Sequence, residues 1–381
     1  MDNFEFRNPT KLIFGKGSIS KLRDNLPKDK RVMITFGGGS VKQNGVYDQV
    51  IAALEGYDIV EFWGIEPNPR VETVRKAVAL ARAESVGYFL AVGGGSTLDA
   101  TKVIAAATVA QEDAWEIVLK GVYTGASLPV AAVLTLPATG SEMNAGSVIS
   151  NDATNEKYAV YTYHPEFSIL DPEATYSLPA HQVACGLADT FVHVLEQYLI
   201  AENASPLMDR WAEGILMTVC EIAPRIKAEP TNYEHMSNFM LCATMALNGF
   251  VSMGVHQDWT THMIGHELTA LTGLTHGHTL TIVLPGVMDV LRDQKGSKIL
   301  QFGERVFGVT VGSPDERITA TIVATEEFFR SLGLKTRLAE NGVGDEVVAQ
   351  LVARLEERQT RFGERANVTF AEVAQILALR K

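Results

Sequence analysis

Histidine is concentrated in one short stretch of the chain, where five of the nine histidines lie between His256 and His278. Neutral imidazole is a common metal ligand, so this concentration favours a metal site. His262 and His266 are four residues apart and would share one face of a helix. His276 follows them, and the residues after it, 277–279, predict a turn that could bring His276 back toward that face.

A second pair of candidate ligands lies upstream. Asp189 and His193 are also four residues apart, in a segment from 180 to 199 that we predict to be helical. This pair and two of the later histidines would offer three nitrogen donors and one oxygen donor. Such a set suits Fe(II), Zn(II), Co(II) or Ni(II), because Mg(II) and Ca(II) prefer oxygen ligands alone. Spacing by itself leaves open which two histidines take part.

Other metal-binding residue types have simpler interpretations. His164, His181 and His235 stand apart and are interpreted as packed or surface side chains. Cys185 lies one helical turn before Asp189 and could be a ligand, although a buried cysteine that packs as a small apolar side chain is the preferred interpretation. The segment that begins at His262 lacks the glutamate of the zinc-protease motif HExxH.

Three glycine-containing turns follow three apolar runs in the first half of the chain. The runs 32–36, 88–92 and 130–136 lead into Gly37-Gly38-Gly39-Ser40, Gly93-Gly94-Gly95-Ser96 and Thr139-Gly140-Ser141-Glu142. Helix-like stretches at 48–54 and 71–83 separate the first two turns. One such turn would equally be a tight strand–helix connection. Three of them favour a parallel sheet whose carboxyl edge binds a nucleotide, with the pyrophosphate at a helix start.

The first turn also bears on the type of dinucleotide. An acidic side chain there usually binds the ribose 2′-hydroxyl of NAD, whereas NADP requires its absence. No acidic residue occurs from Thr35 to Asn44, and Ser40 and Lys42 could meet a 2′-phosphate. The sequence therefore favours NADP(H) over NAD(H).

Strand patterns nearly vanish after residue 178, and helix signals take their place. Ser205-Pro206 predicts a helix start, because proline suits the first helical position. Ser313–Glu316 and Thr369–Glu372 have the form of capping boxes, and Gly333 predicts the end of the helix that the first of these opens.

These elements predict an α/β protein with two domains. Residues 1–178 would form a Rossmann-like parallel-sheet domain that binds a dinucleotide, and residues 179–381 an all-helical domain that binds metal and substrate. A chain of 381 residues is long enough for two such cores.

Composition limits the partners and the compartment. The formal net charge of −12 argues against nucleic acid or an anionic membrane surface as a partner. No apolar run approaches the roughly 18 residues that span a bilayer. The start lacks the basic and apolar regions of a signal peptide, and three widely spaced cysteines indicate no disulfide framework. We therefore expect a cytoplasmic protein.

Motifs along essentially the whole chain match one family. They include the start at 8–15, the glycine turns, Glu66-Pro67-Asn68-Pro69 and GGGS-x-x-Asp at 93–99. One long signature is met by Asp171, Pro179, Gly186, Asp189 and Glu196. A second is met by Trp259, His262, Gly265, His266, Gly273, His276 and Gly277. On these residues the chain resembles the iron-containing (group III) alcohol dehydrogenases, and among them most the NADPH-dependent broad-range aldehyde reductases and butanol dehydrogenases.

The resemblance implies a role for each matching residue. It implies the metal ligands Asp189, His193, His262 and His276, and it implies that His266 relays protons near the nicotinamide. It implies that the cofactor is contacted by Gly37, Gly38, Gly39, Ser40, Asn68, Gly94, Gly95, Ser96, Asp99, Thr135, Thr139, Ser141, Asn144 and Lys157. We take His266, Asp99 and Lys157 as the candidate catalytic residues.

The family further implies a dehydroquinate synthase-like fold, a homodimer with N-terminal strands at its interface, and a divalent metal such as Fe(II) or Zn(II). The implied reaction is hydride transfer between NADP(H) and a small aliphatic alcohol or aldehyde. One alternative is a glycerol dehydrogenase-like polyol dehydrogenase of the same superfamily. Alternatives from other classes are a metal-dependent hydrolase and a non-catalytic nucleotide sensor.

Overall fold

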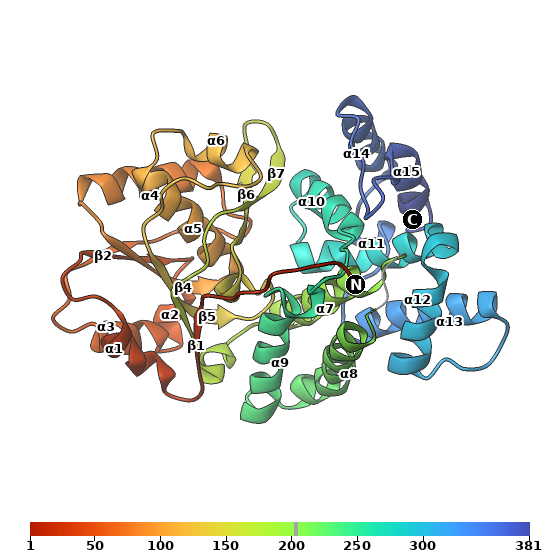
Figure 1. Ribbon diagram of the computed structural model, residues 1–381, viewed down its shortest axis with the longest axis horizontal. Helices are drawn as coiled ribbons and strands as arrows, with labels where there is room; N and C mark the ends of the chain where they lie inside the picture. Colours follow the sequence, from red (N-terminus) through yellow and green to blue (C-terminus); the bar gives the residue numbers. More distant parts are fainter. Residues whose placement is uncertain (202–204) are drawn as a thin grey trace. The chain divides into compact units, whose positions relative to one another are not determined.

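The computed structural model describes residues 1–201 and 205–381, which form two compact units (Figure 1). The sheet unit comprises Arg7–Leu178 together with Pro230–Asn248. The helical unit comprises Met1–Phe6, Pro179–Glu229 and Gly249–Lys381. The predicted boundary at residue 178 assigns residues 1–6 to the first domain and residues 230–248 to the second. In the structure residues 1–6 pack with the helical unit, and residues 230–248 pack with the sheet unit. Local sequence patterns report secondary structure and carry little information on such long-range packing.

The sheet unit is built on six parallel strands in the order β1–β8–β5–β4–β2–β3. Their bounds are Lys11–Phe14 for β1, Val32–Phe36 for β2, Ile59–Phe62 for β3, Tyr88–Gly94 for β4, Val130–Leu136 for β5 and Phe167–Leu170 for β8. The central strands β2, β4 and β5 are buried on both faces, which is why they are near-continuous apolar runs in the sequence.

Helices cover both faces of this sheet. Successive strand residues point to opposite sides, so Met33 and Phe89 join one core cluster while Ile34 and Leu90 join the other. The first cluster includes α4 (Val71–Ala83), α5 (Gly95–Val109) and α6 (Ala114–Leu119). The second includes η1 (Ser18–Lys21), α1 (Leu22–Asn25), α2 (Ser40–Gln43) and α3 (Val46–Ala53).

Two parts of the sheet unit have no counterpart in the sequence analysis. One is an antiparallel pair of strands, β6 (Gly146–Asn151) and β7 (Glu156–Tyr161). The other is α9 (Tyr233–Ala246), whose Met240 packs with Leu134 and Leu170 of the sheet. The short helices η2 (Ser141–Met143) and η3 (Pro172–Thr175) complete this unit and both contact α9.

The helical unit is organised around α7 (Ala180–Tyr198), which is buried from Val183 to its end and contacts α8, α10 and α11. Phe191 of α7 lies among the rings of Phe302, Phe328 and Phe329. The other elements are α8 (Pro206–Ala228), η4 (Phe250–Ser252), α10 (Thr260–Thr272), α11 (His276–Val290), α12 (Arg292–Phe307), α13 (Pro314–Ser331), η5 (Ala339–Asn341), α14 (Asp345–Glu357) and α15 (Phe370–Ala378).

The predicted helix boundaries are confirmed. Ser205 caps α8 by accepting a hydrogen bond from Met208 N, and complete capping boxes open α13 at Ser313 and α15 at Thr369. Gly333 follows the end of α13 with a φ of 86°. The predicted fold class, a parallel-sheet unit and a helical unit, is confirmed as well. Among the residues that the structure describes, no helix is long and apolar enough to cross a membrane.

Candidate metal centre and cofactor-binding turns

Helix α7 presents three polar side chains on one buried face. Asp189, His193 and Glu196 are spaced at i, i+4 and i+7, which places them one above the other along the helix. Each is at most 4% exposed. Burying two carboxyl groups and an imidazole is costly unless each is paired or binds a cation, so this face is the first structural sign of a site.

Helices α10 and α11 supply the other histidines. His262 and His266 both lie on α10, the helix that their spacing predicted, and both are buried. The chain reverses at Gly273, whose φ is 72°, and His276 is the first residue of α11. The predicted turn at 277–279 is therefore wrong, because these residues form the first turn of α11. The reversal instead precedes His276, where glycine provides the left-handed conformation that ends α10.

A close helix contact brings His276 to α7. A Cβ atom built on Gly277 would overlap the backbone carbonyl of Cys185, so only glycine allows α11 to approach α7 this closely. His276 immediately precedes this contact, and its Nε2 lies 4.0 Å from Asp189 Oδ1.

Three imidazoles converge on one carboxylate oxygen. Asp189 Oδ1 lies 3.5 Å from His262 Nε2, 3.6 Å from His193 Nε2 and 4.0 Å from His276 Nε2. Ligand atoms of Asp189, His262 and His276 all lie within 4.8 Å of one another. Donors about 2.1 Å from a tetrahedral ion stand roughly 3.4 Å apart, which is close to these separations. The donor set of one oxygen and up to three nitrogens therefore fits a divalent transition metal.

The electrostatics of His262 favour a cation at the same place. Burial would lower the pKa of this imidazole, but the carboxylates of Glu196 and Asp189 outweigh burial and raise the pKa to about 9. The two carboxylates thus favour positive charge at this position.

His266 lies next to this group on α10. Its ring centroid is 4.7 Å from that of His276 and 6.3 Å from that of His262. Sequence spacing could not decide between His266 and His276 as a ligand. In the structure it is His276 that lies in the set with Asp189 and His262.

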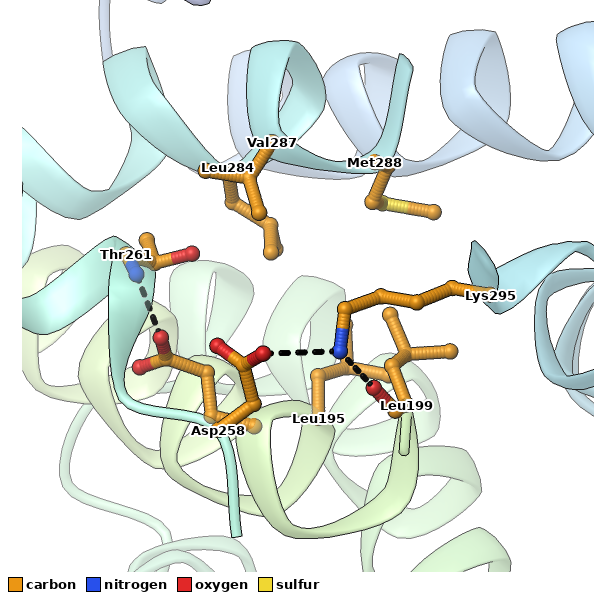
Figure 2. Close-up of a pocket in the computed structure, with 9 residues that line it drawn as sticks. Leu195, Leu199, Asp258, Thr261, Leu284, Val287, Met288 and Lys295 are labelled. Atoms are coloured by element: carbon orange, nitrogen blue, oxygen red, sulfur yellow. Dashed lines mark hydrogen bonds and ion pairs between the residues drawn. The ribbon is translucent and has the colours of Figure 1, made fainter. Parts of the chain in front are cut away.

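Glu196 is a member of the site whose role sequence reasoning missed. Its Oε1 accepts hydrogen bonds from the backbone of Thr261 and His262, at 2.5 and 3.3 Å, and its Oε2 pairs with His262 Nδ1. The signal was present, since Glu196 stands two helical turns after Asp189. A small cavity borders this carboxylate (Figure 2), and it is lined by Leu195, Glu196, Leu199, Asp258, Thr261, Leu284, Val287, Met288 and Lys295.

One cysteine and three histidines that the sequence analysis set aside are not in the group around Asp189 that could hold a metal ion. Cys185 is buried, burial raises the pKa of its thiol to about 12, and its Sγ lies 3.6 Å from His181 Nε2. His181 is otherwise exposed, and His164 and His235 are half-buried. These placements agree with the simpler interpretations of all four residues.

In the sheet unit, the glycine turns meet at one edge. The strands β2, β4 and β5 are parallel neighbours, so the turns that follow them lie at the same carboxyl edge. Gly93 and Gly95 are needed there, because a Cβ on either would overlap Thr97 or Thr139 respectively. Gly95 is the first residue of α5, so this turn delivers the start of a 15-residue helix to the sheet edge.

A hydrogen bond between Asp99 and Ser141 connects the third turn, residues 139–142, to α5. Asp99 Oδ1 accepts a hydrogen bond from Ser141 Oγ at 2.5 Å, and Oδ2 accepts one from Val148 N at 2.9 Å. Asn144 donates to Thr139 O within the same loop, at 3.2 Å. Burial raises the pKa of Asp99. This predicted cofactor and catalytic residue therefore also organises the loop that carries Ser141.

Three lysines, Lys157, Lys102 and Lys42, also lie in this part of the sheet unit. Lys157 Nζ donates to Asn68 Oδ1 at 2.8 Å, so these two predicted residues lie together. Lys102, which sequence reasoning did not single out, lies one turn after Asp99 and is 1% exposed. Its Nζ donates to Ser141 O, Asn144 O and Gly146 O. Lys42, the predicted phosphate partner, stands over the Trp63 ring at 4.0 Å. The other predicted residues lie at strand ends, turns and helix starts of the same edge: Gly37, Gly38, Gly39, Ser40, Gly94, Ser96 and Thr135.

Comparison with known proteins accounts for this arrangement. A sequence model of the iron-containing alcohol dehydrogenase family matches residues 9–172, and a model of the C-terminal part of the Fe-containing alcohol dehydrogenase family matches residues 183–380. Fold and sequence thus define a metal-associated alcohol oxidoreductase. The chain belongs to the iron-containing alcohol dehydrogenase family, and the predicted resemblance is confirmed.

Several relatives are similar over their whole length. The NADPH-dependent aldehyde reductase YqhD of Escherichia coli is 50% identical, with 97% of each chain covered. A probable NADH-dependent butanol dehydrogenase of Bacillus subtilis is 41% identical, with 99% of each covered. The crystal structure of E. coli YqhD superposes with a TM-score of 0.98 over 100% of this chain and 99% of that one. A butanol dehydrogenase from Thermotoga maritima gives a TM-score of 0.95 at 34% identity, over 100% and 99% of the two chains.

Proposed function

We propose that this chain is a metal-dependent NADP(H) alcohol dehydrogenase and aldehyde reductase that interconverts small aliphatic alcohols and aldehydes. The observation that carries this proposal is the convergence of three imidazole nitrogens on Asp189 Oδ1, at 3.5, 3.6 and 4.0 Å. Family membership supports the reaction class. The 50% identity to an NADPH-dependent aldehyde reductase supports the substrate class and the cofactor.

In this proposal Asp189, His193, His262 and His276 hold a divalent metal, Fe(II) or Zn(II). When bound, the ion supplies Lewis acidity toward the substrate oxygen, and the nicotinamide supplies or accepts the hydride. His266, buried beside His276, moves the proton that the reaction requires.

The sheet edge binds the dinucleotide. The turns at 37–40 and 93–96 take the pyrophosphate and ribose, because backbone N–H groups at helix starts suit anions. Ser40 and Lys42 meet the 2′-phosphate of NADP(H). Asp99 and Lys157 orient the cofactor through the loop and side-chain contacts at 2.5 and 2.8 Å that they make with Ser141 and Asn68.

The ligand assignment is tested by removing one imidazole at a time. His262→Ala and His276→Ala should lose both the metal, measured by elemental analysis of the purified protein, and activity. His256→Ala is the matched control, since His256 is exposed and pairs with Asp2 at 2.9 Å. Full metal content and turnover in His262→Ala would show that the assignment is wrong.

The reaction is tested with purified enzyme and a panel of substrates. Oxidation of NADPH, followed by its absorbance, should be fast with butanal and slower when NADH replaces NADPH. Faster turnover of glycerol with NAD would favour the polyol dehydrogenase instead. No change in nicotinamide absorbance with any alcohol or aldehyde would favour the metal-dependent hydrolase or the nucleotide sensor.

Assembly and location form a further part of the proposal. A homodimer is supported by the position of β1 at the edge of the six-stranded sheet, where no other strand of the described residues pairs with its outer side. Light scattering from purified protein tests this, and a monomer would contradict it. Three free cysteines suit a reducing cytoplasm.

A further inference from the structure

Glu196 is the carboxylate that lies directly behind one of the candidate ligands. It follows Asp189 by two turns and His193 by one turn on α7, and it is 4% exposed. Its own backbone carbonyl accepts a hydrogen bond from Asp258 N at 2.8 Å, which ties α7 to the residues just before α10.

The side chain of Glu196 divides its two oxygens between two tasks. Oε1 accepts from Thr261 N at 2.5 Å, which Figure 2 draws as a dashed line, and from His262 N at 3.3 Å. These N–H groups belong to the first turn of α10, where no helical carbonyl is available to them. Oε2 pairs with His262 Nδ1. One carboxylate therefore fixes both the start of α10 and the ring of His262.

The two ring nitrogens of His262 face different groups. Nδ1 faces Glu196, whereas Nε2 faces Asp189 Oδ1 at 3.5 Å. When Nδ1 donates its proton to a carboxylate, the lone pair of a neutral imidazole is left on Nε2 and the ring cannot rotate freely. A ring held in this way is ready to bind a metal at Nε2.

We propose that Glu196 is a positioning residue of the metal centre, which holds His262 in the tautomer and orientation that place its Nε2 lone pair on the ion. This inference rests on the proposed function, because it assumes that the site binds a metal. It assigns to Glu196 a role beyond capping α10.

Glu196→Gln separates these two roles. The glutamine oxygen can still accept from Thr261 N and His262 N, so the cap is retained. The glutamine NH₂ then faces Nδ1 and donates to it, which moves the imidazole proton to Nε2 and blocks the ligand position. Metal affinity should fall about 10- to 100-fold, the range usual for carboxylates behind histidine ligands.

The measurement is the dissociation constant of Zn(II), determined on metal-stripped protein by competition with a chromogenic chelator. Urea unfolding of the metal-free protein is measured beside it. Asp258→Asn is the matched control. Asp258 also serves the start of α10, accepting from Thr260 N at 3.0 Å, but its side chain pairs with Lys295 at 2.9 Å (Figure 2). This control should keep wild-type Zn(II) affinity even if its stability falls.

Wild-type Zn(II) affinity in Glu196→Gln would overturn the proposal, and so would an equal loss of affinity in the Asp258→Asn control. A wild-type protein that binds no metal would instead contradict the proposed function itself.

A second measurement uses the wild-type protein and so does not depend on whether a variant folds. In Zn-loaded wild-type protein, nitrogen NMR of labelled histidine should show the His262 proton on Nδ1. A proton-free Nδ1 would overturn the proposal.

Discussion

At the scale of single residues, the proposed metal ligands and the proposed proton relay can be tested separately. His262 and His266 share α10, and the Nε2 of His262 lies 3.5 Å from Asp189 Oδ1. His266 instead lies beside His276, with ring centroids 4.7 Å apart. A residue next to a ligand but outside the ligand set can affect proton transfer without holding the ion.

His266→Ala should therefore retain the metal while kcat falls by about 10²- to 10⁴-fold, the usual contribution of a general acid or base. Its rate should also vary with pH differently from that of the wild type. The measurement is kcat against pH for aldehyde reduction, with metal content determined on the same samples and His256→Ala as control. Wild-type kinetics across the pH range would dismiss the relay.

Residue spacing could supply the candidate ligands but not the choice among them, which came from the family resemblance alone. Asp189 and His193 follow from helical spacing, and so does the pairing of His262 with His266. The selection of His276 depends on a chain reversal at Gly273, which spacing alone did not reveal. The hydrogen bonds of Glu196 to α10 could not be predicted from the sequence, because they depend on the approach of α10 to α7.

At the scale of elements, one glycine controls whether α11 can reach α7. Gly277 lies against the backbone of Cys185. The overlap that a side chain at this position would cause cannot be relieved by a rotamer change. His276 is the adjacent residue and moves with the helix. If His276 binds the metal as proposed, packing at this contact and metal binding are coupled.

Gly277→Ala should destabilise the metal-free protein by about 1–3 kcal/mol, as overpacking does, and should weaken metal retention by displacing His276. Urea unfolding and metal analysis measure the two effects. Gly214→Ala on α8 is the control, because a Cβ there meets no atom within 4 Å. It should stabilise the protein by roughly 0.5–1 kcal/mol through helix propensity. Equal stability of Gly277→Ala and wild type would show that the contact is not tight.

Elements with strong local signals were predictable and the others were not. β2, β4 and β5 were apparent because buried parallel strands are apolar throughout, and α13 and α15 because their capping boxes are local. In β6 every second residue is buried, but two of these buried residues, Ser147 and Asn151, are polar, so the sequence shows only a weak alternation of apolar and polar residues. Helix α9 was missed as part of the sheet unit because Met240 packs against strands more than 60 residues away in the sequence.

At the scale of the whole molecule, the three cysteine thiols have similarly raised pKa values. Burial raises the pKa of each of the Cys185, Cys220 and Cys242 thiols from 9.0 to about 12. Thiolate is the reactive form, so the folded protein should react slowly with thiol reagents near neutral pH.

The native chain should therefore label slowly with iodoacetamide at pH 8, and urea-unfolded chain should label at the rate of free cysteine. The same shifts affect stability. Between pH 9 and 12 the unfolded chain releases thiol protons that the native protein keeps, so the free energy of unfolding should fall as pH rises. Rapid labelling of the native protein at pH 8 would contradict the raised pKa of these thiols.

The interleaving of the two units has a consequence for how the chain folds as it is made. The sheet unit needs α9, which includes Met240 of its core and Thr244, whose hydroxyl donates to Glu142. Synthesis delivers residues 179–229 before α9 exists. The sheet unit therefore cannot complete its core on the ribosome until about residue 248 has emerged. By then α7, with Asp189 and His193, has already left the exit tunnel. A nascent chain stopped at residue 178 should lack a completed core, so the two halves of this enzyme must mature together and not one after the other.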